Sequence, residues 1–415
     1  PKKGTFRKYI HLDKCIPKWV SFETPILRDL LTKIRSTKIS QLDKLENKFT
    51  FFKTKYIQAL GGLHSDNKNE IYEETDEYEI HDYDVASMYP AIIVNNKYFP
   101  AHLGEELLKE YTTLYHKRLR LKPLAKKDKK IKGVVEGLKL ALNAVFGKLG
   151  SMESWLYDKQ ALLGTTLTGQ FCLLMLIEMY ETNGFHVISA NTDGVTVLVN
   201  KNRIEDIERI NNLWQEKTSF TLEKAKYKKI IYSTVNDYIA IVDGDPKPKV
   251  KGDFIKNFEL WKNKSARIIP MALEAYFING IDPIEFISNH KNIYDFCIMA
   301  RATGQLRLEE QDEKGNIKKH KKLVRYYLSE TSTTQLYKRG IGTTGKNANI
   351  SLHAPNAIGE IYIQYFNQFE QKDNYNIAYK HYILKALERI DAICKTNKAK
   401  GYIEQFRKTK QISLF

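Results

Sequence analysis

The stretch that most constrains the fold lies at residues 81–93, HDYDVASMYPAII, where an extended pattern gives way to a helical one. Acidic residues at alternate positions, Asp82 and Asp84, end the extended run, and apolar residues then recur near helical spacing. The pattern predicts a strand that delivers Asp84 to a turn. A carboxylate there suits magnesium, a hard cation that takes oxygen ligands and leaves positions for substrate phosphates. A simple helix-capping aspartate remains the alternative.

Composition narrows the class of partner. The chain has 415 residues, of which 42% are hydrophobic, so it can bury a sizeable core and is expected to form two or three subdomains. Its 66 Lys and Arg against 49 Asp and Glu give a net charge of +17, which favours a polyanion such as nucleic acid. A basic protein without a special partner is the alternative.

Cysteine usage and hydropathy bear on the compartment. The four cysteines lie far apart without Cys-x-x-Cys spacing, which indicates neither a disulfide framework nor a zinc site and fits the cytoplasm. No apolar run is expected to approach a membrane span, so no membrane partner is expected. The start, Pro-Lys-Lys-Gly, is expected to be the interior of a longer polypeptide.

A pair of helices is predicted after the acidic stretch. Residues 105–122 place apolar side chains on one side, as in an amphipathic helix. Pro123 and a basic cluster then break the pattern, and a second helix is predicted near residues 133–148. The chain is therefore expected to reverse here and form a helical hairpin.

Charged and aromatic side chains share faces on these two helices. Arg118 and Lys122 lie four residues apart on the first helix. Lys139, Asn143 and Phe146 follow at i, i+4 and i+7 on the second. One lysine on a helix usually marks a solvated face, but cations beside an amide and an aromatic ring can hold a triphosphate and a base. The hairpin is therefore a candidate phosphate-binding element.

A second acidic position falls in a predicted β-hairpin. Residues 187–199 have the pattern of two strands joined by a tight turn at residues 191–194, Asn-Thr-Asp-Gly. Such a turn is common for structural reasons alone. Asp193 nevertheless places a second carboxylate at a strand end, as Asp84 does.

Other stretches carry less chemical information. Gly61 and Gly62 permit positive φ and close approach of a ligand, although a plain turn explains them equally well. Residues 158–182 are expected to form an apolar core helix, and residues 247–252 a basic turn. A boundary is expected near Asp253, followed by a mainly helical pattern with a hairpin whose strands lie near residues 305–310 and 320–328.

Three stretches together resemble the family B DNA polymerases, most closely the compact kind carried by bacteriophages. Residues 84–93, DVASMYPAII, resemble the family's first motif, DxxSLYPSII. Residues 139–147, KLALNAVFG, are similar to the second, KxxxNSxYG. Residues 191–194, NTDG, match the third, DTDS, in two of four positions. Arg118 and Lys122 resemble the family's fingers pair.

The resemblance implies an α+β right-hand fold, with an antiparallel-sheet palm, helical-hairpin fingers and a mainly helical thumb. The expected subdomains are an exonuclease-linker remnant and the start of the palm at 1–80, palm at 81–102, fingers at 103–148, palm at 149–252 and thumb at 253–415.

The resemblance also implies template-directed transfer of nucleotides from dNTPs to a primer 3′-hydroxyl, in DNA replication of the phage type. Asp84 and Asp193 would bridge two Mg²⁺ ions, with Mn²⁺ as a substitute, and the Val85 carbonyl would serve the nucleotide-side ion. Lys139 is the candidate general acid or electrostatic stabiliser at the leaving pyrophosphate. Tyr89 would select deoxyribose by a clash with a ribose 2′-hydroxyl.

Two sets of contacts complete the expectation. The nucleotide-binding set is Val85, Ser87, Met88, Tyr89, Arg118, Lys122, Lys139 and Asn143. The set for primer-template DNA is Gly61, Gly62, Phe146, Gly147, Tyr238, Lys249 and Lys251. Too few residues precede Asp84 for the family's 3′–5′ exonuclease, so that domain is expected to be separate or upstream.

Departures from the family pattern qualify the resemblance. Asn191 stands where the family has an Asp, and Gly194 replaces Ser. Of the family's Lys-Lys-x-Tyr element only Tyr238 is kept, and Lys249 and Lys251 are expected to compensate for the lost grip on duplex DNA. The short spacing between the motifs leaves little room for the insertions of protein-primed members, so a nucleic-acid primer is expected.

Two rival classes remain open. A catalytically inactive, polymerase-like DNA-binding protein would explain Asn191. A reverse transcriptase or RNA polymerase shares a palm with metal-binding carboxylates, but its second motif would lack the Lys-to-Gly helix.

Overall fold

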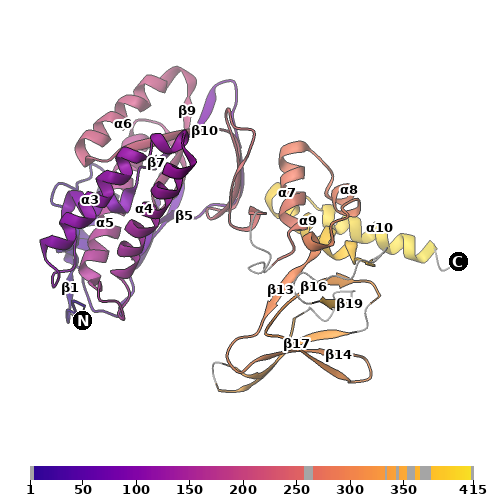
Figure 1. Cartoon of the computed structure of the whole chain (residues 1–415). Coiled ribbons are helices and arrows are strands. Elements are labelled where there is room, and N and C mark those ends of the chain that lie inside the picture. Colours follow the sequence, from indigo (N-terminus) through magenta and orange to yellow (C-terminus); the bar gives the residue numbers. More distant parts are fainter. Residues whose placement is uncertain are drawn as a thin grey trace. The chain divides into compact units, whose positions relative to one another are not determined.

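A computed structural model describes residues 4–256, 265–331, 334–342, 345–352, 360–364 and 375–412. The chain divides into two compact units, each with helices and strands (Figure 1). The first consists of 1–68, 72–230 and 242–247, and the second of 69–71, 231–241 and 248–415. The expected combination of helix and sheet, an α+β composition, is confirmed.

An antiparallel sheet forms the framework of the first unit. Its strands follow the order β10-β7-β9-β8-β5-β4-β3, and β6 pairs with β10. The strands are β3 (Glu46–Phe51), β4 (Thr54–Ala59), β5 (Gly62–Ser65), β6 (Lys68–Glu73), β7 (Tyr78–Val85), β8 (His186–Asn191), β9 (Gly194–Asn200) and β10 (Leu222–Thr234). A short pair, β1 (Ile10–His11) and β2 (Lys38–Ile39), lies outside this sheet.

The two acidic stretches lie on neighbouring strands of this sheet. The predicted strand ending at Asp84 is β7, and the predicted hairpin is β8 and β9, so both predictions are confirmed. Alternate valines of β9, Val195, Val197 and Val199, are fully buried, which fixes the register of that strand against the core. In this register Asp84 lies opposite Gly194.

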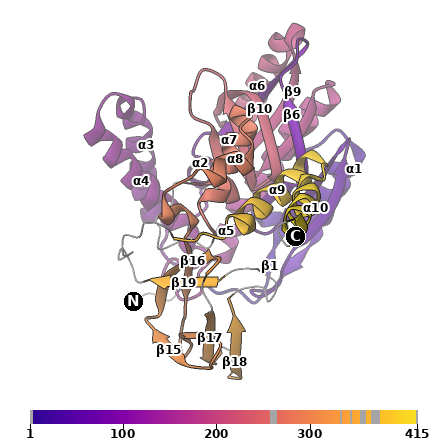
Figure 2. The ribbon, with the colours of Figure 1, turned by 90° about the vertical axis from the view of Figure 1, so that its right-hand side faces the viewer.

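Helices pack beside the sheet in the first unit (Figure 1). They are α1 (Pro25–Ser36), α2 (Met88–Asn96), α3 (Glu105–Leu121), α4 (Lys129–Lys148), α5 (Lys159–Thr182) and α6 (Ile204–Thr218), with the 3₁₀ turns η1 (Leu12–Cys15), η2 (Leu124–Lys126) and η3 (Lys201–Arg203). The predicted helical hairpin is α3 and α4, which Figure 2 shows as neighbours. α4 starts earlier than predicted because Asp128 caps it, accepting from the backbone N–H of Lys130 and Ile131.

The central helix α5 corrects one expectation. An 18-residue window within Lys159–Thr182 has a mean hydropathy of 1.5, so by length and composition this helix could cross a membrane. The expectation that no apolar run approaches a membrane span is therefore wrong. The same window is 89% buried inside the protein, because α5 packs at the centre of the first hydrophobic core. Burial explains its apolar sequence.

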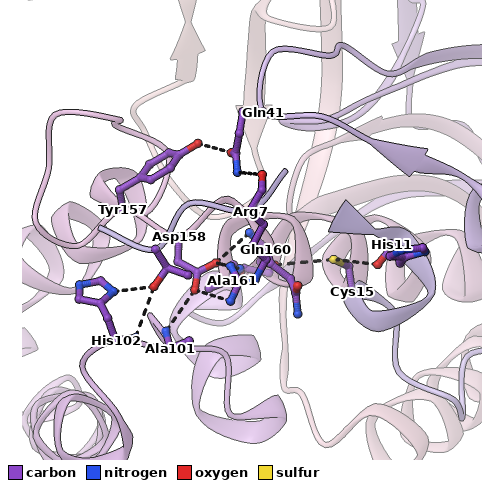
Figure 3. A network of polar contacts seen from close by, with 12 residues as sticks. Arg7, His11, Cys15, Gln41, Ala101, His102, Tyr157, Asp158, Gln160 and Ala161 are labelled. Atoms are coloured by element: carbon purple, nitrogen blue, oxygen red, sulfur yellow. Dashed lines mark hydrogen bonds and ion pairs between the residues drawn. The ribbon is translucent and has the colours of Figure 1, made fainter. Parts of the chain in front are cut away.

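A buried carboxylate ties together both ends of the helical hairpin (Figure 3). Asp158, whose side chain is 1% exposed, caps α5 and pairs with Arg7 of the N-terminal segment at 2.5 Å. It also accepts a hydrogen bond from the backbone N–H of Ala101, in the connection from α2 to α3, at 3.1 Å. Asp158 itself lies in the connection from α4 to α5. One side chain thus fixes both roots of the hairpin.

The second unit contains two further sheets as well as helices. One sheet has the order β13-β16-β19 and the other β15-β14-β17-β18. Its elements are β11 (Asp237–Val242), β12 (Lys249–Lys251), η4 (Gly252–Phe254), α7 (Ile268–Asn279), α8 (Pro283–Ser288), η6 (Ile293–Phe296), β13 (Ile298–Arg301), β14 (Arg307–Gln311), β15 (Ile317–His320), β16 (Leu323–Ser329), β17 (Gln335–Ile341), β18 (Asn347–Ser351), β19 (Glu360–Gln364), α9 (Tyr379–Cys394) and α10 (Lys398–Ile412).

These strands correct the expectation of a mainly helical segment after residue 253. The predicted hairpin exists as β14 and β15, but β16, expected to be its second strand, pairs with β13 in the other sheet. Residues 247–252 were expected to be a turn, yet they contain β12, which pairs with β11. β17 and β18 were not predicted, because strands such as QLYKRGI alternate weakly between apolar and polar residues.

Candidate active site

A cavity of about 1100 Å³ opens in the first unit between the end of β7 and the helical hairpin. Eleven residues singled out in the sequence line it, namely Asp84, Val85, Ser87, Met88, Tyr89, Arg118, Lys122, Lys139, Asn143, Phe146 and Asp193. Three motifs far apart in the sequence are therefore brought to one place.

Two carboxylates lie at one end of this cavity. Asp84 is the penultimate residue of β7, and Asp193 lies in the turn between β8 and β9. The backbone N–H of Val85 donates to the carbonyl of Asp193 at 2.7 Å, which holds the turn against the end of β7. A Cβ on Gly194 would clash with Oδ1 of Asp84. The glycine thus lets the Asp84 carboxylate lie directly against the neighbouring strand.

A third acid in the cavity, Glu223, is absent from the residues predicted from sequence. It lies on β10 directly opposite Asp84 in the strand register. Its carboxylate pairs with the ammonium group of Lys122. The pairing of β7 with β10 joins segments distant in sequence, and no local pattern reveals it. An acidic residue at the start of a long strand was the only available signal.

The helical hairpin supplies the cations. Arg118 is buried, and its guanidinium donates to the hydroxyl of Ser87, which starts the turn after β7. Lys139 and Asn143 lie exposed on the face of α4 that lines the cavity. Positive and amide groups from two helices therefore face the carboxylates across one space.

An aromatic pair forms another part of the wall. Tyr89 of α2 stacks on Phe146 of α4 with ring centroids 4.1 Å apart and planes inclined by 23°. The Tyr89 hydroxyl donates to the carbonyl of Gly61 at 3.3 Å. Burial raises the pKa of Tyr89 to about 12, and the negative charge of Asp193 acts in the same direction. The phenol therefore stays protonated and keeps its donor.

The two glycines before the first acidic strand adopt ordinary backbone conformations. Neither Gly61 nor Gly62 has positive φ, so the expected need for glycine on that ground is not found. A Cβ on Gly61 would meet no atom within 4 Å. The surface there is open, and Gly61 joins the cavity through its carbonyl contact with Tyr89.

Asn191 lies at the end of β8, directly before the turn that carries Asp193. The positive φ of this turn falls on Thr192, at 61°, and not on Asn191. The Asn191 Oδ1 lies 3.0 Å from Nδ1 of His64 on β5 and accepts from the Thr192 hydroxyl at 3.2 Å. The amide thus links β5 to the turn that carries Asp193, which explains the residue without a backbone requirement.

Of the seven predicted DNA contacts only Phe146 lines the cavity, and Gly61 and Gly62, described above, are among the six outside its lining. Gly147 is exposed on α4 outside the cavity lining. Tyr238, Lys249 and Lys251 belong to the second unit, where β11 and β12 pair so that Tyr238 lies opposite Lys251.

The carboxylates of the cavity are possible metal ligands. Across the described residues, no group of three or more His, Cys, Asp and Glu side chains could hold a metal ion. Magnesium, however, is commonly bound by one or two carboxylates together with substrate phosphates and water. Asp84 and Asp193 line one cavity with the cations of the helical hairpin, and this donor set fits such a shared site.

The site combines carboxylates at strand ends with cations on a helical hairpin, the chemistry of a site for phosphate esters. No protein-family model and no curated protein matches the sequence. Among solved structures, the chain is similar to the family B DNA polymerase from the hyperthermophilic archaeon Pyrobaculum calidifontis, with 15% identity and a TM-score of 0.45. The match covers 86% of this chain and 48% of that polymerase, so the chain spans about half its length.

Proposed function

We propose that this chain is a DNA-directed DNA polymerase of the family B type, acting in DNA replication of the phage kind. One observation carries the proposal: Asp84 and Asp193 line the same cavity as Arg118, Lys139 and Asn143. The first two are the residues of the metal-binding motifs, and the others are those of the fingers motifs. The proposal assigns palm, fingers and thumb to the segments expected from the sequence.

The carboxylates act on the metal and the primer side. When bound, two Mg²⁺ ions, or Mn²⁺ in their place, supply the charge that activates the primer hydroxyl and neutralises the phosphate oxygens. Asp84 and Asp193 would hold these ions, with the Val85 carbonyl on the nucleotide side. Primer-template DNA and dNTPs are the proposed partners, and a separate or upstream 3′–5′ exonuclease is a further one.

The cations act on the triphosphate. In the reaction the primer 3′-oxygen bonds to the α-phosphorus, and the bond from that phosphorus to the bridging oxygen of pyrophosphate breaks. Arg118, already oriented by Ser87, and Lys122 would neutralise the outer phosphates. Lys139 would stabilise the leaving pyrophosphate or donate its proton. Lys122 must exchange its partner Glu223 for phosphate when the nucleotide binds.

The aromatic pair acts on the sugar and base. Tyr89 is held by Phe146 and by the Gly61 carbonyl, so its ring has a fixed place beside Asp193. We propose that this fixed ring excludes the ribose 2′-hydroxyl. Met88 completes the nucleotide-binding set, and the expected DNA contacts Gly61, Gly62, Phe146, Gly147, Tyr238, Lys249 and Lys251 remain proposals.

Primer extension tests the function. The chain is incubated with Mg²⁺, a labelled DNA primer on DNA or RNA template, and dNTPs or ribonucleotides. The proposal requires extension on the DNA template with dNTPs. Binding of duplex without any extension would favour the inactive DNA-binding alternative, and a preference for the RNA template would favour a reverse transcriptase.

A further inference from the structure

We propose that Lys127, Lys129 and Lys132, at the tip of the α3–α4 hairpin, form a second subsite for polyphosphate anions. Its ligands are inorganic pyrophosphate and the outermost phosphates of a nucleoside triphosphate. The identity of these ligands rests on the proposed function, while the subsite itself rests on the geometry of the cavity. All three lysines line the cavity that holds Asp84 and Asp193.

The lysines continue the face of α4 that carries the predicted nucleotide contacts. Cavity-lining residues of α4 recur at alternating steps of three and four, which is one face of a helix. The polar and aromatic members of this face are Lys129, Lys132, Glu136, Lys139, Asn143 and Phe146, and the apolar Val135 and Leu142 line the cavity beside them. At 1.5 Å rise per residue, Lys132 lies about 10 Å and Lys129 about 15 Å along the helix from Lys139. The cationic face thus extends beyond the residue proposed to meet the leaving group.

Among the residues that the structure describes, these lysines have no carboxylate within ion-pair distance. Lys122, on the same wall, is paired with Glu223. Within the described part of the chain, Lys127, Lys129 and Lys132 take part in no ion pair. The carboxylate of the adjacent Asp128 caps α4 and accepts hydrogen bonds from the backbone N–H groups of Lys130 and Ile131. An incoming anion would therefore meet three exposed cations that form no ion pair with a described carboxylate, although Asp128 and Glu136 line the cavity beside them.

The position of the lysines is unfavourable for the helix alone. The first turn of α4 contains no acidic residue, although the positive end of the helix dipole favours acids and disfavours cations. Lys129 and Lys132 both lie close to that end. A bound polyanion would relieve this repulsion. Anion binding would therefore explain the presence of lysines that the helix dipole disfavours.

The subsite has a consequence for product release. Pyrophosphate formed beside Lys139 can move past Glu136 toward Lys132 and Lys129, and it then lies farther from Asp84 and Asp193. Charge would guide the product outward along α4.

The test measures binding of inorganic pyrophosphate to the full chain by isothermal titration calorimetry, without DNA or nucleotide. The double variant Lys129→Gln/Lys132→Gln is compared with Lys130→Gln/Lys148→Gln, which removes two exposed charges from the same helix outside the cavity lining. We expect the native chain to bind pyrophosphate in two steps. The cavity variant should lose one step, or weaken it by about tenfold, since each lysine contributes a charge contact.

The controls decide the interpretation. The matched variant and Lys129→Arg/Lys132→Arg should both keep two steps with affinities within about twofold of native, since charge at the cavity is retained. Lys139→Gln should keep the step that Lys129→Gln/Lys132→Gln loses. Identical binding by the native chain and both double variants would overturn the subsite. A chain that never extends primers but shows the expected loss would refute the polymerase and support the subsite.

Discussion

At the residue scale, the contact between Gly194 and Asp84 sets the shape of the carboxylate end of the cavity. The two residues lie opposite each other on β9 and β7, and the Asp84 carboxylate occupies the space of any side chain at position 194. Packing therefore explains the glycine that stands where the resembled family has a serine.

Gly194→Ala should displace the Asp84 carboxylate and lower the rate of primer extension by at least about tenfold, because misplacement of a reacting group is costly. Steady-state incorporation of one nucleotide measures this rate. The melting temperature of the variant checks that it is folded. Gly137→Ala on α4, where a Cβ meets no atom within 4 Å, is the control and should keep the native rate. A native rate in Gly194→Ala would contradict the packing account.

Residue-scale prediction from sequence worked where the signal was local. Asp84, Lys139 and Asp193 each lie in a stretch whose own pattern fixed its strand or helix. Asn191 was placed in the correct turn, but its contact with His64 could not be predicted because it depends on a distant strand. Glu223 could not be found, since its position opposite Asp84 depends on the pairing of β10 with β7.

At the element scale, the hairpin of α3 and α4 depends on one buried anchor. Asp158 accepts hydrogen bonds from Arg7, from the backbone of Ala101 and from the first turn of α5 (Figure 3). These partners come from three separate segments of the first unit.

Asp158→Ala should lower the free energy of unfolding of the first unit by about 3 kcal/mol, because it leaves Arg7 unpaired and removes a helix cap. Urea denaturation followed by fluorescence measures the change. Glu46→Ala removes the exposed pair with Lys48 and should cost less than about 1 kcal/mol. Equal costs for the two variants would count against the anchor.

The strand β7 also carries an acid-sensitive pair. Burial lowers the pKa of His81 below its ordinary value of 6.5, although a hydrogen bond with Glu79 opposes this. For Glu79, burial would raise the pKa, but hydrogen bonds from Lys226 and His81 outweigh it and lower the pKa. Each of these two residues therefore has a higher pKa in the unfolded chain than in the folded chain.

Stability of the first unit should therefore fall as the pH drops below 6.5, the ordinary pKa of His81, and fall further as Glu79 titrates. Urea denaturation at a series of pH values between about 7.5 and 5 measures the slope. His81→Gln should flatten the upper part of this dependence, and exposed His116→Gln should leave it unchanged. An unchanged slope in His81→Gln would refute the role of His81.

At the scale of the whole molecule, the sequence predicts the first unit better than the second. The first unit has helices with strong apolar periodicity and a hairpin with a tight turn. Each of these local sequence patterns corresponds to an element of the structure. In the second unit, β17 pairs with β14 and β18 through polar strands whose partners are distant in sequence. Its two sheets depend on these long-range pairings, which composition and periodicity do not encode.

The net charge of +17 fits a protein that binds nucleic acid. The cavity, which has Asp84 and Asp193 at one end and Lys and Arg side chains along its wall, fits the binding of triphosphates. We propose that Asp84 and Asp193 act together in nucleotide incorporation. The most direct test is magnesium-dependent primer extension by the native chain, Asp84→Asn and Asp193→Asn, with duplex affinity measured by fluorescence anisotropy.

The native chain should extend the primer. Each variant should lose at least about a hundredfold in rate, because one carboxylate cannot hold the charge needed at the reacting phosphate. Duplex affinity should stay within about threefold of native, since neither carboxylate contributes a favourable charge contact to the DNA backbone. A silent native chain, or extension at near-native rate by either variant, would contradict the claim.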